Sequence, residues 1–573
     1  MALDFATLPK EYPRRFVPQQ INLGDWAQIE PLLDELERRS INTKEALERW
    51  LLDESELFSA IFEERAVRYI RMTCQTDDPE HEKAYLYFVE QIDPKLKPRA
   101  QELEKRYVAS LARQKLPKER YFVLDRRTEN DVALFREENV SLETETTKLA
   151  QRYQKLCGAM TVQFEGREQT LQQMAKYLEE PDRDVRQKAW ELIAERRLKD
   201  RHQLDEVYDE LLSLRQQIAR NAGFENYRDY AFRRLERFDY TPEDCFRFHE
   251  GVERFVVPLM RELQKRRQQE MSLKVLRPWD LAVDPQGRPP LRPFDSTKKL
   301  VEGCAAIFKR VDRELGEWFQ RMADLNLLDL ESRKGKAPGG YQITLTERRL
   351  PFIFMNAVGR DGDVRTLLHE AGHAFHTFST REESLAAYRH APTEFSEVAS
   401  MSMELLGGQY LDEFYKPEDA ARSRQEHLER VLTLLAWIAT IDAFQHWIYT
   451  QPSHTRQQRE DYWVELHKRF GGIESWEGYE EALRAQHWQR QLHLYQYPFY
   501  YIEYGIAQLG ALGIWQRAQK GRQEAVQAYK RALAVGGSRP LPELFKAAGL
   551  SFDFGKETIA RAAGSLRAVL TGE

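Results

Sequence analysis

The sequence predicts a mainly α-helical protein with one small β-sheet. Apolar residues recur at every third or fourth position between charged ones along most of the chain, which is the period of helices that bury one face. Only the stretch from residue 341 to residue 358 has the pattern of β-strands. Because a chain of 573 residues is too long for one simple core, we expect two or three lobes.

The helical period runs through the first half of the chain. It covers, in order, Trp26 to Arg39, Glu56 to Thr73, Glu82 to Gln91, Ser141 to Tyr177, Asp184 to Asn221 and Glu243 to Gln269. Prolines interrupt it between Lys274 and Asp295. We expect an ordered connection here, because Trp279 and Leu281 are apolar side chains that it can bury. A further helix is expected from Ser296 to Asp324.

Strand-like sequence is confined to two short runs. Tyr341-Gln-Ile-Thr-Leu-Thr alternates and is β-branched, and Pro351-Phe-Ile-Phe-Met-Asn-Ala-Val is apolar and is followed by Gly359. Helical sequence resumes after Val364. We therefore divide the chain into an N-terminal helical region (1–200), a helical lobe with the proline-rich connection (201–330), and a C-terminal region with the sheet (331–573).

Composition argues against several classes of protein. Charged residues make up 31% of the chain but nearly cancel, leaving a formal net charge of −6, so we expect no nucleic-acid partner. The four cysteines form no Cys-x-x-Cys pair, which predicts reduced thiols rather than a cysteine zinc site or a disulfide framework. The N-terminal residues lack the pattern of a secretory signal, and no uninterrupted apolar run reaches about 18 residues. We expect a cytoplasmic protein without a membrane partner.

The strongest chemical signal is His369-Glu370-Ala-Gly-His373, which lies within an apolar helical period. Two histidines four positions apart lie on one face of a helix, about one turn from each other, so both imidazoles reach one metal ion. Glu370 then points toward the open side of the ion, where its carboxylate can take a proton from water. Asp361 and Asp363 mark the predicted start of this helix.

A catalytic zinc ion needs a third protein ligand. His376 shares the general face of the helix, but three ligands from one straight helix lie too far apart along its axis for a tight tetrahedron. A second helix, which begins near Pro392 and ends at two glycines, is the better source. It carries Glu394, Glu397 and Glu404 broadly along one side, and the residues alone do not choose among these three.

Spacing excludes two other zinc peptidase patterns. In thermolysin-like enzymes the third carboxylate follows the second histidine after about twenty residues, where this chain has Pro392 and Thr393. The metzincin pattern requires glycine at position 376 and histidine at position 379, where this chain has His376 and Ser379.

Together the motifs resemble those of the thimet oligopeptidase and oligoendopeptidase F family of zinc metallopeptidases. The resemblance rests on His369-Glu-Ala-Gly-His-Ala-Phe-His376, on Phe395-Ser-Glu397-Val-Ala-Ser-Met, and on a tyrosine-rich segment near the C-terminus. It implies one Zn²⁺ per chain, with Glu397 as the third ligand and Glu370 as the general base. It also implies a zincin-type helical fold of two lobes around a deep substrate channel, with residues 331–573 as the catalytic region.

The tyrosine-rich segment runs from residue 493 to residue 505. Tyr497, Tyr501 and Tyr504 recur at the spacing of one helix face. The resemblance implies that His493, Tyr501 and Tyr504 stabilise the oxyanion of the reaction, each by about 3 kcal/mol. It assigns Tyr497 to substrate binding. Because the spacing is one residue shorter than in thimet oligopeptidase, Tyr500 is an alternative to Tyr501 and is a second candidate for substrate contact.

The predicted activity is hydrolysis of internal bonds in short, unstructured oligopeptides. The strand from Phe352 to Asn356 is expected to pair its edge with an extended substrate, and Phe354, Asn356 and Gly340 are the predicted binding residues beside it. Two alternatives remain open. One is a zinc carboxypeptidase of related helical fold, which removes C-terminal residues, and the other is an inactive peptide-binding helical scaffold.

Overall fold

The computed structural model describes residues 4–333, 335–337 and 339–572. The predicted mainly α-helical fold with a small sheet beside the His369 helix is confirmed. The chain forms two compact units, each assembled from separated stretches. Unit 1 comprises Met1–Ala133, Leu291–Arg424 and Gly510–Phe552, and unit 2 comprises Leu134–Pro290, Gln425–Leu509 and Asp553–Glu573. The three consecutive regions 1–200, 201–330 and 331–573 divide the chain by sequence pattern and stay a prediction.

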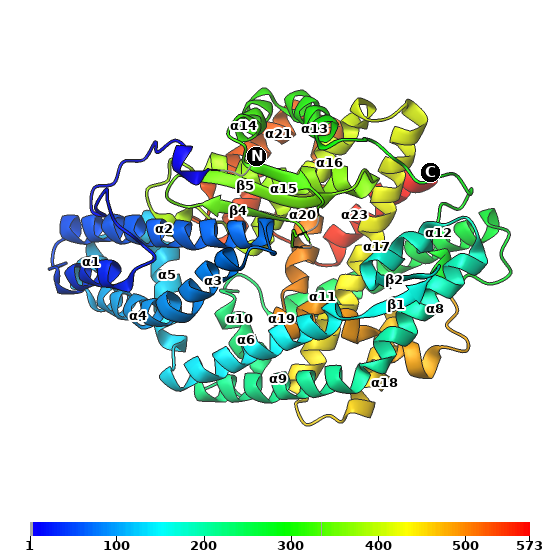
Figure 1. Cartoon of the computed structure of the whole chain (residues 1–573), viewed down its shortest axis with the longest axis horizontal. Helices are drawn as coiled ribbons and strands as arrows, with labels where there is room; N and C mark the ends of the chain where they lie inside the picture. The colour runs from blue at the N-terminus through cyan, green and yellow to red at the C-terminus, as the bar shows by residue number, and fades with distance from the viewer. Residues whose placement is uncertain (1–3, 334, 338, 573) are drawn as a thin grey trace. The chain divides into compact units, whose positions relative to one another are not determined.

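Unit 1 contains the N-terminal helices and the helices around the sheet (Figure 1). They are α1 (Trp26–Arg38), α2 (Lys44–Cys74), α3 (Pro79–Tyr87), α4 (Asp93–Ala109), α5 (Lys118–Leu134), α13 (Thr297–Val311), α14 (Arg313–Asp324), α15 (Asp361–Ser379), α16 (Thr393–Gly407), α21 (Arg522–Val535) and α22 (Leu541–Ala547). Trp50 is at the centre of the N-terminal core, fully buried, and its indole N–H donates to Leu36 O at 2.9 Å. The apolar faces predicted for the N-terminal helices therefore meet in one core.

The sheet of unit 1 has three strands in the order β3 (Leu328–Glu331), β5 (Leu350–Ala357), β4 (Tyr341–Leu345). Strand β5 pairs in parallel with β3 and antiparallel with β4. Helix α15 packs against β4 and β5 (Figure 1). The two predicted strands are confirmed, and β3 is an addition that its four residues were too few to indicate.

Unit 2 is helical apart from one hairpin. Its helices are α6 (Glu137–Gly158), α7 (Leu171–Met174), α8 (Arg183–Lys199), α9 (Arg201–Asn221), α10 (Tyr227–Arg234), α11 (Pro242–Gly251), α12 (Val257–Glu270), α18 (Arg456–Phe470), α19 (Leu492–Gln496) and α23 (Lys556–Thr571). Two of the unit boundaries fall inside the remaining helices, α17 (Pro417–Thr450) and α20 (Tyr501–Lys520).

The hairpin corrects the helix predicted from Ser141 to Tyr177. After α6, strand β1 (Thr161–Phe164) pairs antiparallel with β2 (Arg167–Thr170). The two residues between the strands, Glu165 and Gly166, have φ values of 52° and 74°. Two consecutive positive φ angles are characteristic of a tight hairpin turn, which ends the helical period locally.

The helix predicted from Ser296 to Asp324 is divided in two by Asp312. Its backbone is extended (φ −159°, ψ 138°), and its carboxylate accepts from the N–H groups of Glu314 and Leu315. Aspartate in this position satisfies the first free N–H groups of the following helix. The apolar period runs through the break unchanged, so the sequence pattern alone does not reveal it.

The proline-rich connection between Lys274 and Asp295 contains a short 3-10 helix, Pro278–Asp280, and buries one of the two apolar side chains that we expected to anchor it. Trp279 is buried, whereas Leu281 is only partly buried. The fully buried carboxylate of Asp280 adds a polar anchor, since it accepts hydrogen bonds from Arg183 and Arg186.

Helix α17 is long and apolar enough, by length and composition, to cross a bilayer. However, 78% of its most apolar window is buried inside the protein. A buried core helix passes the same compositional test, so this helix is weak support for a membrane span.

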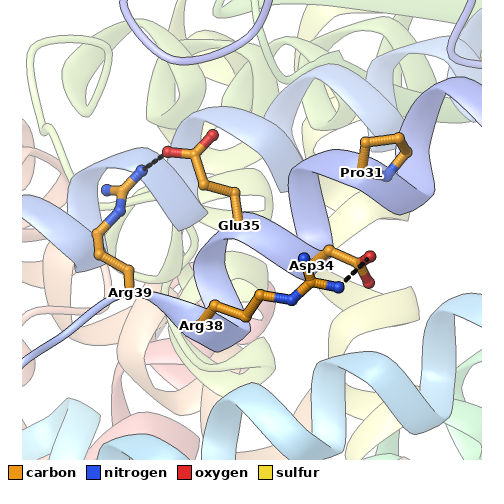
Figure 2. A pocket seen from close by; sticks show the side chains of 5 residues that line it. All are labelled: Pro31, Asp34, Glu35, Arg38 and Arg39. Carbon is orange, nitrogen blue, oxygen red and sulfur yellow. Dashed lines mark hydrogen bonds and ion pairs between the residues drawn. The ribbon is translucent and has the colours of Figure 1, made fainter.

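A surface hollow on α1 carries none of the predicted chemistry. Figure 2 shows the side chains that line it, which are Pro31, Asp34, Glu35, Arg38 and Arg39. Arg38 pairs with Asp34 at 3.1 Å, and Arg39 pairs with Glu35 at 2.6 Å. These charges are already paired, along α1 and its C-cap residue Arg39 and with Asp53 and Arg99 of the neighbouring helices.

Candidate active site

Helix α15 carries the two candidate imidazoles and begins where the sequence predicts. The Asp363 carboxylate accepts from the N–H groups of Val358 and Arg360, at 2.8 and 2.9 Å, and so caps the helix. Gly372 faces the second helix, α16. A Cβ on Gly372 would lie 2.5 Å from Ser400 Cα, so only glycine permits this approach.

Helix α16 places Glu397 opposite the two histidines of α15. Its Oε2 lies 3.4 Å from His369 Nε2 and 3.7 Å from His373 Nε2. These three ligand atoms all lie within 4.8 Å of one another. Tetrahedral zinc with bonds of about 2.0–2.1 Å separates its ligand atoms by about 3.3 Å, so the donor set fits this ion. Glu397 and the two histidines remain the predicted ligands.

Polar neighbours orient these candidate ligands. Glu404 Oε1 lies 2.7 Å from His369 Nδ1, which fixes the ring so that Nε2 faces Glu397. The Ser400 hydroxyl donates to Glu397 Oε2 at 2.9 Å. The residues alone did not choose among Glu394, Glu397 and Glu404 as the third ligand. In the structure Glu404 holds the His369 ring and is not one of the three clustered ligand residues.

The two other residues weighed as ligands lie outside this group of three. Glu394 is buried near the start of α16. His376 is also buried, and its Nε2 has no hydrogen-bond partner within the described part of the chain. Burial, with the neighbouring His390 and His373, lowers the pKa of His376 to about 3, so this imidazole is neutral.

The electrostatics of the site favour a cation. Burial lowers the pKa of His369, but the hydrogen bond and charge of Glu404 raise it more, to about 10. Burial lowers the pKa of His373 to about 4 and raises that of Glu370 to about 7. Carboxylates therefore outnumber the positive charges that the protein itself supplies, and a bound dication would balance them.

The free edge of the sheet belongs to β4, and this corrects the strand expected to pair with substrate. Strand β5, which contains Phe352 to Asn356, is central and paired on both sides. Ile353 N donates to Leu327 O, away from β4, and Gln342 is the residue opposite Ile353. In an antiparallel ladder such an opposing residue directs its N–H and C=O outward. The backbone of Gln342 also acts on the Glu370 carboxyl, where it opposes the rise in pKa that burial causes.

The side chain of Phe354 is directed into the protein, not toward a ligand. It is fully buried and stacks on Tyr341, with ring centroids 4.8 Å apart. Lys336 Nζ lies 4.4 Å from the centroid of the Phe354 ring and donates to Met355 O at 2.6 Å. The Phe354 ring is therefore covered, and a substrate contact of Phe354 stays a prediction.

Asn356 and Lys336 hold the loop before β4 on the sheet. The Asn356 amide donates to Ala337 O at 2.8 Å and to Gly339 O at 2.9 Å. Gly339 has a φ of 99°, a conformation that favours glycine, and the exposed Gly340 follows it. The amide protons of Asn356 thus position the loop, while Gly340 stays a candidate for substrate contact.

In unit 2, the tyrosine segment is not the single helix face that its spacing predicts. Helix α19 ends at Gln496 and α20 begins at Tyr501, so Tyr497 lies outside both. Phe499 in the intervening turn has a φ of 65°. Its N–H donates to Gln445 Oε1 and its C=O accepts from Arg237. These buried partners hold a backbone conformation that a phenylalanine seldom adopts.

The turn nevertheless gathers the predicted residues around His493. The ring of His493 lies 4.9 Å from that of Tyr501, 5.7 Å from Tyr500, 5.9 Å from Tyr504 and 6.1 Å from Tyr497, measured between centroids. Tyr501 is buried, whereas 55% of Tyr497 is exposed. Within unit 2, the structure therefore brings together all the residues that the sequence singled out in this segment.

A hydrogen-bond chain fixes the tautomer of His493. The indole N–H of Trp437 donates to Gln491 Oε1 at 3.1 Å, and an indole can only donate. This leaves the Gln491 amide N–H to donate to His493 Nδ1 at 2.8 Å. The neutral imidazole then carries its proton on Nε2, as a hydrogen-bond donor to substrate must. No pattern in the sequence marks Gln491 or Trp437, because their roles depend on tertiary contacts.

Profiles of known protein families match two parts of this chain. The profile described as "Peptidase family M3" matches residues 176–563. The profile described as "Peptidase M3 N-terminal domain" matches residues 16–135. The first match alone spans more than half of the chain and includes all the candidate site residues.

Individual relatives agree with these profiles. Group B oligopeptidase PepB of Streptococcus agalactiae is 24% identical over 316 residues, which are 54% of this chain and 51% of that protein. Oligopeptidase PepF of Bacillus subtilis is 27% identical over 228 residues, which are 39% of this chain and 33% of that protein. The chain thus aligns with about half or less of the length of these two relatives.

A solved structure extends the likeness to the whole fold. The structure titled "PZ peptidase A with inhibitor 2" superimposes with a TM-score of 0.89 at 29% sequence identity. The superposition covers 98% of this chain and 99% of that one.

Proposed function

The chain belongs to peptidase family M3, and from this premise we propose that it is a zinc-dependent metalloendopeptidase that cuts short, unstructured oligopeptides. The observation that carries the proposal is the approach of His369 Nε2, His373 Nε2 and Glu397 Oε2 beside the carboxylate of Glu370. Two imidazoles and one carboxylate form the donor set of hydrolytic zinc sites, and a neighbouring glutamate supplies the general base.

His369, His373 and Glu397 would hold one Zn²⁺ per chain. Zinc, when bound, would polarise the scissile carbonyl and lower the pKa of a water molecule. Glu404 fixes the His369 ring, and Ser400 fixes the Glu397 carboxylate, so both ligands are held in position before a metal binds.

Glu370 is the proposed general base. Its burial raises its pKa to about 7, so its carboxylate accepts a proton readily near neutral pH. In the proposed reaction it takes a proton from the attacking water and gives it to the nitrogen of the leaving amine.

His493 and the tyrosines are the proposed oxyanion donors. The Nε2 proton of His493, fixed by Gln491, and the hydroxyls of Tyr501 and Tyr504 are the groups that we assign to this role. Burial raises the pKa of Tyr501, and the neighbouring Gln491 and Trp437 side chains oppose that rise, so both act on its hydroxyl. Tyr500 therefore stays its alternative for the oxyanion, and we keep Tyr497 and Tyr500 as substrate contacts.

Substrate binding follows from the free edge of β4. We propose that an extended peptide pairs with the outward N–H and C=O groups of this strand, beside Gly340. Pairing of this kind reads backbone rather than side chains, which suits substrates of varied sequence. The two lobes and deep channel implied by the family resemblance would exclude folded proteins. Cytoplasmic location, and the absence of nucleic-acid and membrane partners, are part of the same proposal.

The test is cleavage of a peptide blocked at both ends, with and without a chelator. We expect cleavage at internal bonds, loss of activity on chelation and recovery with Zn²⁺. Glu370→Gln should lower kcat by about 10²–10⁴-fold while zinc content stays unchanged. Release of single C-terminal residues from open peptides only would indicate a carboxypeptidase, and full activity of Glu370→Gln would contradict the assignment of the base.

A further inference from the structure

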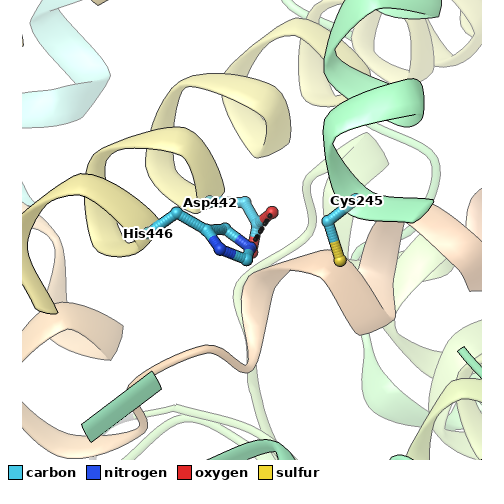
Figure 3. A group of neighbouring side chains, drawn as sticks. All are labelled: Cys245, Asp442 and His446. Atoms are coloured by element: carbon cyan, nitrogen blue, oxygen red, sulfur yellow. Dashed lines mark ion pairs between the residues drawn. The ribbon is translucent and has the colours of Figure 1, made fainter. Parts of the chain in front are cut away.

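A second group of metal-binding side chains lies in unit 2, within a buried contact between α11 and α17. Helix α11 supplies Cys245 and His249, four positions apart, and α17 supplies Asp442 and His446 at the same spacing. All four are at most 4% exposed. Figure 3 shows Asp442 and His446 on one helix, with Cys245 reaching toward them from another. Two i,i+4 pairs on facing helices direct four potential ligands into one small volume.

Distances within this group match those of a metal site. Cys245 Sγ, an Asp442 oxygen and a His446 nitrogen lie within 4.8 Å of one another. Asp442 Oδ2 is 3.3 Å from His446 Nε2, the separation that tetrahedral zinc gives its ligands, about 3.3 Å. His249 Nε2 lies 2.8 Å from the same oxygen, as a hydrogen-bond partner of a ligand carboxylate does.

Several polar atoms of the group are left without partners. Within the described part of the chain, Asp442 Oδ1 and His446 Nδ1 are buried and form no hydrogen bond, and His446 Nε2 lies 3.3 Å from Asp442 Oδ2 without the geometry of a hydrogen bond. Leaving a buried polar atom unsatisfied costs about 1–3 kcal/mol, so such atoms are rare in folded proteins. Two such atoms in one group, beside a thiol, are the donors that a bound ion would satisfy.

We propose that Cys245, Asp442 and His446 form a second, structural metal site that takes a borderline-soft divalent transition-metal ion such as Zn²⁺. Thiolate, imidazole and carboxylate together suit this class of ion, whereas Mg²⁺ and Ca²⁺ prefer oxygen ligands alone. His249 acts as the positioning residue that holds the Asp442 carboxylate. The proposal is independent of the peptidase site and replaces the expectation of no cysteine zinc site, which rested on the absence of a Cys-x-x-Cys pair.

Proton and charge balance are consistent with this site. The Cys245 thiol gives up its proton to solvent as the sulfur–metal bond forms, so binding releases one H⁺. A thiolate and the Asp442 carboxylate then match the two charges of the ion. Burial raises the pKa of the Cys245 thiol, and the charge of Asp442 adds to this, so the thiol stays protonated without a metal. Arg237 opposes this effect and Asp244 reinforces it.

The position of the group suggests what the metal does. The ring of His446 lies 5.4 Å from that of Phe499, the residue held at positive φ in the tyrosine segment. Gln445, the neighbour of His446, accepts the N–H of Phe499. An ion that fixed His446 would therefore also fix the turn that precedes Tyr500 and Tyr501.

Cobalt binding to the full-length protein tests the proposal. Metal is removed with a chelator, and Co²⁺ is then added back in small steps. The site of His369, His373 and Glu397 contains no sulfur, so a thiolate-to-cobalt charge-transfer band reports on a cysteine site alone. Cys304→Ser, which changes a second buried cysteine, is the matched control for Cys245→Ser. Circular dichroism checks that each variant is folded.

We expect the wild type and Cys304→Ser to show the band, and Cys245→Ser to lack it and bind one ion fewer. His249→Gln should retain the band with about 10–100-fold weaker binding of Co²⁺. Asp442→Asn, which keeps the thiol, should also weaken binding at least tenfold, and it serves if Cys245→Ser does not fold. No band in the wild type, a band that persists in Cys245→Ser, or unchanged affinity in Asp442→Asn would overturn the proposal. If the wild type bound only one equivalent of Co²⁺ in total and that equivalent gave the band, the result would support this site and contradict the proposed zinc site of the peptidase centre.

Discussion

The two helices of unit 1 that carry the proposed metal ligands and the histidine–tyrosine segment of unit 2 arrange their side chains by different means. In α15, His369 and His373 face one way because four residues make about one helical turn. In unit 2, Tyr497 and Tyr501 are also four residues apart, yet a turn and not a helix joins them. Equal spacing thus has a different structural meaning in the two regions.

The difference lies in what holds the backbone. Hydrogen bonds within α15 hold it at each position, so the side-chain directions follow from sequence order. The turn at Phe499 is held by side chains from elsewhere in unit 2, namely Gln445 and Arg237. A site of the first kind can be predicted from a motif, whereas a site of the second kind depends on partners that no motif contains.

The largest effects are expected from the proposed oxyanion donors. His493→Gln and Tyr504→Phe should each lower kcat by about 10²–10³-fold, because each removes a donor aimed at the developing charge. Zinc content should not change, which separates these residues from the ligands of unit 1. Tyr462→Phe, in the same unit, is the control and should leave kcat unaffected. Loss of zinc in either variant would show that the two regions are not functionally distinct.

A smaller effect is expected from Glu404. Glu404→Ala should weaken zinc binding by about 10–100-fold, because it releases Nδ1 of the His369 ring. Competition with a chelator of known affinity measures this, and excess zinc should restore activity. If the affinity of Glu404→Ala equalled that of the wild type, α15 alone would suffice to orient its histidine.

Gln491→Glu tests whether a tertiary partner controls His493, because it changes the charge beside Nδ1 and leaves the histidine itself in place. A carboxylate beside Nδ1 favours the imidazolium, so the pKa of His493 should rise by about 1–3 units, and the ring stays protonated to higher pH. Histidine-labelled NMR measures this pKa, with His493→Gln used to assign the signal. Gln491→Leu, which adds no charge, should not raise it. An unchanged pKa in Gln491→Glu would mean that Gln491 does not control the proton on this ring.

The smallest effect concerns a buried histidine of unit 2 that has no role in the proposed chemistry. Burial, together with Arg484, which donates to its Nδ1 at 3.2 Å, lowers the pKa of His467 to about 3. In the unfolded chain, where the pKa of this histidine is about 6.5, the imidazole binds a proton more strongly than in the folded protein. Protonation therefore favours unfolding, so the contribution of His467 to stability is present above pH 6.5 and is lost as the pH decreases. Between pH 7.5 and 5.5 the loss is about 1.4 kcal/mol in the free energy of unfolding.

Urea unfolding of His467→Gln at the two pH values measures this contribution. The glutamine keeps an acceptor for Arg484 but does not titrate, so the decline should be about 1.4 kcal/mol smaller than in the wild type. Both proteins are compared with metal removed, so that loss of zinc from unit 1 does not enter. An equal decline would place the pH sensitivity in other groups.

Much of the fold could be predicted from the sequence, and the failures share one cause. The helices and the two runs of strand were predicted because their periods are local. The hairpin at Glu165 and Gly166 and the break at Asp312 were missed, because one or two residues redirect the chain without changing the surrounding apolar pattern. The strand of Phe354 is central rather than at an edge, which only strand order reveals.

The sequence by itself determined the helical class, the faces of the helices and the spacing of His369, Glu370 and His373, because these depend on neighbours within about one turn. Tertiary structure alone decided that Glu397 faces these histidines while Glu404 holds one of them, and that β4 has the free edge. It also brought Cys245 beside Asp442 and His446. These pairings join residues far apart in the chain, and only packing of separate elements specifies which side chains meet.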